Sequence, residues 1–190
     1  MNCDDIFRRE INRCAHFNEA VDVVRKNSSG DIWLIGGAVY RTLVHALYHT
    51  PKPAIDLDFI VEYETNGPNL ENGWVQTKNR FGNPKLINGK VEIDYIPLDK
   101  IYSIIKRKMT PKIENYLSGV PLKIAAIAYD VKRGKLVDGG GLEAIKNRKV
   151  AVNNFFFANI AARKKGLTLR EFILKKAASL NFTPTFPDGI

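Results

Sequence analysis

Two aspartates interrupt an apolar run near the middle of the chain. Asp56 and Asp58 stand one residue apart within residues 54–62, a segment whose other residues are mostly the apolar and β-branched types of a strand. Side chains alternate along a strand, so both carboxylates should share one face while Leu57 and Phe59 take the other. Adjacent carboxylates must share a proton or bind a cation. The pair predicts a magnesium site, or alternatively an edge strand with an exposed polar face.

A third carboxylate follows in the next apolar strand pattern, residues 91–96. Asp94 lies in this segment, and Glu92 shares its face by the same alternation. Nucleotidyl transfer with two metal ions requires an anion that bridges the ions and lets the attacking hydroxyl lose its proton. Asp94 is the candidate for this role, and the sequence leaves Glu92 open as the alternative. A solvent-facing hairpin would show the same pattern.

A glycine pair stands where a phosphate could bind. Gly36 and Gly37 follow the short apolar run 31–35 and precede a helical stripe over residues 38–47. Backbone without side chains can approach a phosphate closely, and the free N–H groups of a helix N-terminus bind it. Arg41 is one turn into that helix and is a candidate phosphate ligand. A tight turn and a surface ion pair are the ordinary alternatives for the glycines and the arginine.

The remaining patterns predict an α+β fold in which a small mixed β-sheet is flanked by helices. Asn88-Gly89 is a strong hairpin signal between residues 85–87 and 91–96. We expect one domain over residues 1–152 and a short helical appendage with a tail over residues 153–190. The expected elements are, in chain order, a helical segment 4–26, strand 31–35, helix 38–47, strand 54–62, loop 63–73, the hairpin, helix 98–108, a second hairpin of 124–130 with 135–137, helices 142–148, 153–165 and 168–180, and a loose tail from 181.

The chain is basic, which favours contact with nucleic acid or with nucleotide phosphates. It has 190 residues, and 29 Lys and Arg against 20 Asp and Glu give a net charge of +9. Basic residues cluster at 106–108, 132–135, 146–149 and 163–165. Any single cluster is most simply a solvated face. If RNA is bound, the clusters at 106–108, 132–135 and 163–165 should form one surface beside the acidic site.

Composition also predicts a cytoplasmic protein. Cys3 and Cys14 match neither a disulfide framework nor a zinc site with the three histidines. Charged residues occupy the start of the chain where a secretory signal would be apolar, and no stretch approaches transmembrane length. The aromatic run Phe155, Phe156 and Phe157 is interpreted as helix packing, with a base-stacking platform as the alternative.

The order of these features resembles the DNA polymerase beta-like nucleotidyltransferase superfamily. The segments 34–39 (LIGGAV) and 56–59 (DLDF) resemble the head domain of class II poly(A) polymerases and CCA-adding enzymes, and so do 124–130 (IAAIAYD) and 134–138 (GKLVD). The resemblance implies that Gly36 and Gly37 contact a triphosphate. It also implies that Asp56 and Asp58 ligate two Mg²⁺ ions, with Asp94 as the third carboxylate near the attacking hydroxyl.

Two departures from that family argue against CCA addition. The family's Arg-Asp after the glycine pair appears here as Tyr40-Arg41, and its Arg-Arg-Asp-Phe-Thr segment is replaced by residues 120–123 (VPLK). The helices that choose the base and hold tRNA in the family have only residues 153–180 as a counterpart.

The function predicted from the sequence is therefore magnesium-dependent transfer of a nucleoside monophosphate from an NTP such as ATP to a hydroxyl, with RNA as the favoured acceptor. A protein or small-molecule acceptor is the alternative within the enzyme class. A non-catalytic nucleotide- or RNA-binding domain on the same scaffold is the alternative outside it. No feature predicts membrane association, and the sequence fixes neither the oligomeric state nor a partner protein.

Overall fold

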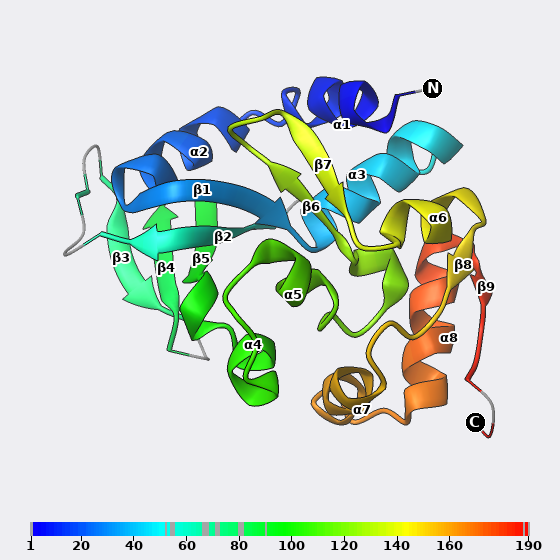
Figure 1. Cartoon of the computed structure of the whole chain (residues 1–190). Helices are drawn as coiled ribbons and strands as arrows, with labels where there is room; N and C mark the ends of the chain where they lie inside the picture. Colours follow the sequence, from blue (N-terminus) through cyan, green and yellow to red (C-terminus); the bar gives the residue numbers. More distant parts are fainter. Residues whose placement is uncertain are drawn as a thin grey trace.

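A twisted sheet of seven strands organises the chain (Figure 1). The computed structural model describes residues 2–51, 53, 56–65, 69–70, 73–79, 82–89, 91–187 and 189. The strand order is β3-β4-β5-β2-β1-β6-β7, in which β2 and β5 are parallel and all other neighbours antiparallel. The strands are β1 Ser28–Ile35, β2 Leu57–Glu64, β3 Val75–Lys78, β4 Pro84–Asn88, β5 Val91–Pro97, β6 Ile127–Asp130 and β7 Lys135–Asp138. The expected mixed sheet of an α+β protein is confirmed.

Helices cover the two faces of the sheet unequally. The larger core lies between the sheet and α1, α2 and α3, and residues of α6 and α8 extend it. The smaller core lies on the opposite face, under α4 and α5. Figure 1 shows the first three helices above the sheet and α4 and α5 below it. The helices are α1 Cys3–Ile11, α2 Phe17–Lys26, α3 Gly37–Tyr48, α4 Tyr102–Arg107, α5 Ile113–Leu117, α6 Gly141–Lys146, α7 Phe155–Arg163 and α8 Leu169–Leu180.

Alternation along β2 divides its side chains as the sequence predicts. Leu57 and Phe59 are buried in the larger core. Asp58 and Ile60 point to the other face, where Ile60 belongs to the smaller core. The polar positions of this strand therefore lie on the less covered face of the sheet. The first two residues of the expected strand, 54 and 55, lie outside the described residues.

The N-terminal helical segment is two helices rather than one. α1 ends at Ile11, and a turn at residues 12–16 separates it from α2. The expected stop after residue 26 is the start of β1, whose pairing with β2 shifts register between Ser29 and Ile32, where Gly30 has a φ of 81°. An apolar period of 3.6 residues continues across the break, so periodicity alone did not reveal it.

Several other elements differ from expectation. β3 and α5 were not predicted, and the segment expected as one helix over residues 98–108 begins as a 3₁₀ turn, Leu98–Lys100, before α4. The tail expected to be loose forms β9, Thr183–Pro184, which pairs in parallel with β8, Lys149–Val150. Of the predicted loop 63–73, Tyr63 and Glu64 belong to β2, and residues 66–68, 71 and 72 lie outside the described part.

None of the described helices is both long and apolar enough to cross a membrane.

The last helix packs into the same core as the sheet. Ile173, Phe172 and Ala177 of α8 are buried in the larger core, and the Lys176 ammonium donates a 3.0 Å hydrogen bond to the Tyr40 hydroxyl of α3. These contacts join the predicted appendage to the domain through apolar burial.

We expect Ile173→Ala to destabilise the whole chain by about 2–5 kcal/mol, because it removes methyl groups from a fully buried position. Urea unfolding should be followed by tryptophan fluorescence, which reports on Trp33 in β1 and on Trp74, and by circular dichroism, which reports on the helices. Both transitions should move together. The neighbouring Leu174→Ala, at a position 42% exposed, is the matched control and should change stability little. A shift in the helical signal alone would show that the appendage unfolds independently.

Candidate active site

Two of the predicted acids meet where β2 and β5 run in parallel. Asp58 is in register with Asp94, so their side chains leave the same face of adjacent strands. Asp56 lies just before β2 and is largely exposed, with 81% of its side chain accessible. A cavity of about 260 Å³ opens at this point and is lined by Asp56, Leu57, Asp58, Lys85, Glu92 and Asp94. The structure thus brings the three predicted carboxylates to one cavity.

The surroundings of Asp58 disfavour its ionised form. Burial and, after it, the negative charges of Asp94 and Asp56 together raise the pKa of Asp58 to about 6, against the smaller opposing effects of Arg41 and Lys85. The Oδ1 atom of Asp94 is buried and has no hydrogen-bond partner. A buried carboxylate oxygen without a partner is costly. Both observations fit a place where a cation completes the charge balance.

Glu92 takes a different position from Asp94. It forms an ion pair with Lys85 on the neighbouring strand β4, and 60% of its side chain is exposed. The hydrogen bond to Glu92 raises the pKa of Lys85, and the negative charges of Asp94 and Asp56 raise it further. Asp94, by contrast, lies opposite Asp58. Of the two acids that the sequence left open, Asp94 has the geometry of the third carboxylate and Glu92 that of a surface ion pair.

The glycine turn stands directly beside the acids. Gly36 joins β1 to α3 with φ 68° and ψ −141°, a conformation that side-chain-bearing residues avoid, and a Cβ there would lie 3.5 Å from Asp58 Oδ2. Gly37 begins α3, whose first turn has no side-chain cap. The N–H groups of an uncapped first turn and the helix dipole together favour an anion. This arrangement fits the predicted phosphate contact.

Arg41 links the turn to the acids. Its Nε lies 3.4 Å from the Gly37 carbonyl oxygen, and its Nη2 lies 3.5 Å from Asp56 Oδ2. The guanidinium covers Gly37 so closely that a Cβ at that residue would lie 2.2 Å from Nη2. A positive charge therefore sits between the helix N-terminus and the carboxylates.

The donor set suits Mg²⁺. Four carboxylates line the cavity or its edge against the two cations Lys85 and Arg41. Within the described part of the chain, no group of three or more His, Cys, Asp or Glu side chains is arranged to hold a metal ion by itself. Magnesium needs only one or two protein carboxylates, because water and substrate phosphates fill the rest of its octahedral shell. Asp58 and Asp94, with Asp56 beside them, could supply the one or two carboxylates that such a site needs.

Two residues of this region were not predicted from the sequence. Lys85 pairs with Asp94 across the β4–β5 hairpin, and the Asn88-Gly89 turn contained the signal, because turn length fixes hairpin register. Tyr116 belongs to α5, which the sequence did not predict. Burial raises the pKa of Tyr116, and the negative charge of Asp58 raises it further, which places this phenol near the acids.

Known structures share this fold. A tRNA-processing enzyme with CTP is 22% identical over 82% of this chain and 40% of its own, with a TM-score of 0.55. A CCA-adding enzyme with CTP is 17% identical over 87% of this chain and 40% of its own, with a TM-score of 0.55. The Bacillus stearothermophilus CCA-adding enzyme in complex with CTP is 17% identical over 81% and 36%, with a TM-score of 0.51. No family model matches the chain, and no curated protein matches it in sequence.

The chain therefore has a nucleotidyltransferase fold that resembles the head domain of CCA-adding enzymes, as its motifs predict. It spans less than half the length of these similar proteins.

The raised pKa of Asp58 predicts how stability depends on pH. A carboxyl whose pKa rises from 3.8 to about 6 on folding destabilises the fold when ionised, so the cost appears between about pH 4 and 6 and is complete above pH 6. Asp58→Asn should stabilise the metal-free protein by about 1–3 kcal/mol at pH 7.5 and by almost nothing at pH 4. Urea unfolding at both pH values measures this, with the exposed Asp22→Asn as control. A destabilising effect at pH 7.5 would show that Asp58 is a structural acid.

Replacing Gly37 should weaken triphosphate binding without unfolding the chain. In Gly37→Val, the new side chain displaces the Arg41 guanidinium and blocks the approach of phosphate to the α3 N-terminus. We expect NTP affinity in the presence of Mg²⁺ to fall by about tenfold or more, as measured by titration calorimetry. Ala46→Val, later in the same helix, controls for the β-branched residue. Equal affinity in Gly37→Val and the parent would remove the glycine turn from the site.

Proposed function

We propose that this chain is a nucleotidyltransferase that moves a nucleoside monophosphate from an NTP to a hydroxyl group. The observation that carries the proposal is the in-register pair Asp58 and Asp94, with Asp56 beside it, next to the glycine turn at the N-terminus of α3. The arrangement puts a cation site and an anion site within one small region. Such a pair of sites suits a triphosphate that arrives with its metal.

Each part of the site has a role in this reaction. The N–H groups at Gly36 and Gly37 and the Arg41 guanidinium bind the phosphates that leave as pyrophosphate. Asp56, Asp58 and Asp94 hold Mg²⁺, which when bound neutralises phosphate charge and orients the reacting oxygens. The acceptor oxygen forms a bond to the α-phosphorus as the bond to the pyrophosphate oxygen breaks. Asp94 is placed to take the proton of that hydroxyl.

The donor is a nucleoside triphosphate, with ATP and CTP as the first candidates, since structures similar to this one hold CTP or ATP. We propose RNA as the acceptor, supported by the net charge of +9. A cytoplasmic location accords with this substrate and stays a prediction from composition. A non-catalytic binding domain is less consistent with the site, because unpaired carboxylates repel phosphate unless a metal is held there.

The basic surface differs from the expected one. Asp130 pairs with Trp33, and β6 runs antiparallel to β1, so the turn at residues 131–134 leads away from Gly36. Lys132 and Arg133 lie beside Asp31 instead. Arg133 is also neutralised by ion pairs with Asp31 and Asp130. The expectation of one surface formed by three clusters is therefore wrong for this one. The clusters at 106–108 and 163–165 belong to the ends of α4 and α7, which contact each other through Tyr102 and Phe157.

Removing the acids tests the function. Asp56→Asn, Asp58→Asn and Asp94→Asn should each reduce transfer of label from α-labelled NTP by roughly a hundredfold or more, because each loses a metal ligand. Glu92→Gln is the matched control on the same strand and should retain activity, since Glu92 lies at the cavity edge in an ion pair with Lys85 and is not in register with Asp58. Parent protein is offered each NTP with Mg²⁺ and total RNA, and the labelled product identifies the acceptor. Loss of activity in Glu92→Gln with retention in Asp94→Asn would reverse the assignment of the third carboxylate.

A further inference from the structure

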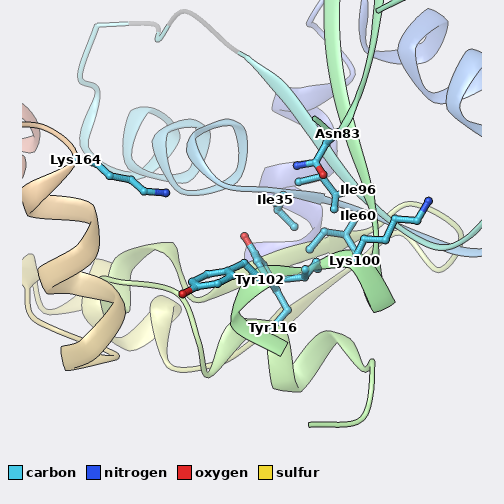
Figure 2. A pocket seen from close by; sticks show the side chains of 9 residues that line it. Ile35, Ile60, Asn83, Ile96, Lys100, Tyr102, Tyr116 and Lys164 are labelled. Atoms are coloured by element: carbon cyan, nitrogen blue, oxygen red, sulfur yellow. The ribbon is translucent and has the colours of Figure 1, made fainter. Parts of the chain in front are cut away.

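A second cavity lies on the same face of the sheet as the acids. Its volume is about 420 Å³, and its lining combines an apolar floor with tyrosines and amines, namely Ile35, Ile60, Asn83, Ile96, Lys100, Ile101, Tyr102, Tyr116 and Lys164. Figure 2 shows Tyr102 and Tyr116 against the isoleucines of the sheet, with Lys164 reaching toward them from α7. The volume and the mixed lining suit one flat ring with a phosphate at its edge.

The floor of this cavity continues the strands that carry the acids. Ile60 and Ile96 lie two residues beyond Asp58 and Asp94 on the same strands, and therefore on the same face. Ile35 pairs with Asp58 across β1 and β2. Tyr116 lines the cavity and also lies within the electrostatic influence of Asp58. A molecule bound in the cavity would thus reach the acid cluster along the sheet.

Aromatic side chains lead outward from the cavity. Tyr102, 58% exposed, stands at its rim and meets Phe157 edge-on with ring centroids 6.1 Å apart. Phe157 meets Phe156 in the same way at 5.1 Å. Phe157 is buried, as the packing interpretation of this run predicts, but Phe156 is half exposed, at 50%. An exposed aromatic face at the mouth of a polar-edged cavity is unusual for helix packing alone and suits stacking by bases.

The charge around this face suits a phosphate backbone. Lys164 and Lys100 line the cavity, and Lys100 also pairs with Glu64 at 2.6 Å. Arg107 lies over the Phe157 ring with its guanidinium carbon 5.9 Å from the ring centroid. The neighbouring Lys106, Lys108, Arg163 and Lys165 add positive charge at the ends of α4 and α7.

We propose that this cavity and the aromatic face at its mouth form the acceptor subsite, which binds the single-stranded 3′ end of an RNA. The terminal base lies on the isoleucine floor beside Tyr102 and Tyr116, with its ribose hydroxyl directed to Asp94. The preceding base stacks on the exposed Phe156, and Lys164 contacts the phosphate between them. The proposal rests on the proposed function for the role of the hydroxyl, whereas RNA binding by this face does not depend on catalysis.

Anisotropy of a short, unstructured 5′-fluorescein RNA, titrated with the full chain without NTP, tests the subsite. Tyr102→Ala and Phe156→Ala should each weaken binding by about fivefold or more with no change in its salt dependence, because they remove stacking. Lys164→Ala should weaken binding and reduce the slope of log affinity against log salt by about one, because it removes one phosphate contact. A blunt duplex of the same sequence should bind more weakly than the single strand.

Matched controls lie outside the lining of the cavity. Tyr63→Ala removes a tyrosine about as exposed as Tyr102, at 61%. Lys135→Ala removes an exposed lysine of β7. Neither substitution should affect RNA binding. NTP affinity with Mg²⁺ should be unchanged in Tyr102→Ala and Phe156→Ala. A loss of NTP affinity in Tyr102→Ala with RNA affinity intact would assign the cavity to the donor base and overturn the proposal. Equal RNA affinity in all variants would also overturn it.

The same variants separate this proposal from the proposed function. Asp94→Asn should abolish transfer while RNA affinity persists, since the acid does not stack on a base. Absence of transfer by the parent with any NTP, together with RNA binding that depends on Tyr102, would reject the enzyme activity and keep the RNA subsite.

Discussion

The parallel pairing of β2 with β5 sets two carboxylates side by side on a half-covered face of the sheet. Asp58 and Asp94 repel each other there, burial raises the pKa of Asp58, and one oxygen of Asp94 lacks a partner. A sheet tolerates such a pair only where a cation is bound or a proton shared. The glycine turn, Arg41 and Lys85 surround this point, so the rest of the site is arranged around one unfavourable interaction that a metal with its triphosphate would relieve.

The unequal covering of the sheet allows this arrangement. The face under α1, α2 and α3 carries the larger apolar core and stabilises the fold, while α4 and α5 cover only part of the other face. Asp58, Asp94 and the cavity bounded by Tyr102 and Tyr116 all lie on that second face. Stability and chemistry are thus separated by the alternation of side chains within single strands, since each strand contributes one set of residues to the core and the other set to the site.

Local patterns in the sequence predicted a large part of this structure. The alternation of Asp58 with Leu57 and Phe59, the Asn88-Gly89 hairpin, and the turn from strand to helix at Gly36 are all observed. Errors arose where a pattern is short or continues across a break. The single N-terminal segment is two helices, α5 is only five residues long, and the tail forms β9, whose pairing with β8 has no local signal. The 132–135 cluster was misplaced because the sequence does not reveal that β6 pairs antiparallel with β1, which carries the turn away from Gly36.

The sequence by itself determined which residues share a face and which turns connect them, because the strand period and turn chemistry act over a few neighbouring residues. It could not decide which strands pair. Strands β2 and β5 are distant in the chain and parallel, and no turn fixes their register, so only the packed sheet showed that Asp94 rather than Glu92 faces Asp58. The cavity lined by Tyr102 and Tyr116 also depends on tertiary packing. Its residues come from β1, β2 and β5, from the segments that precede β4 and α4, from α4 and α5, and from the end of α7, and tertiary packing alone brings them together.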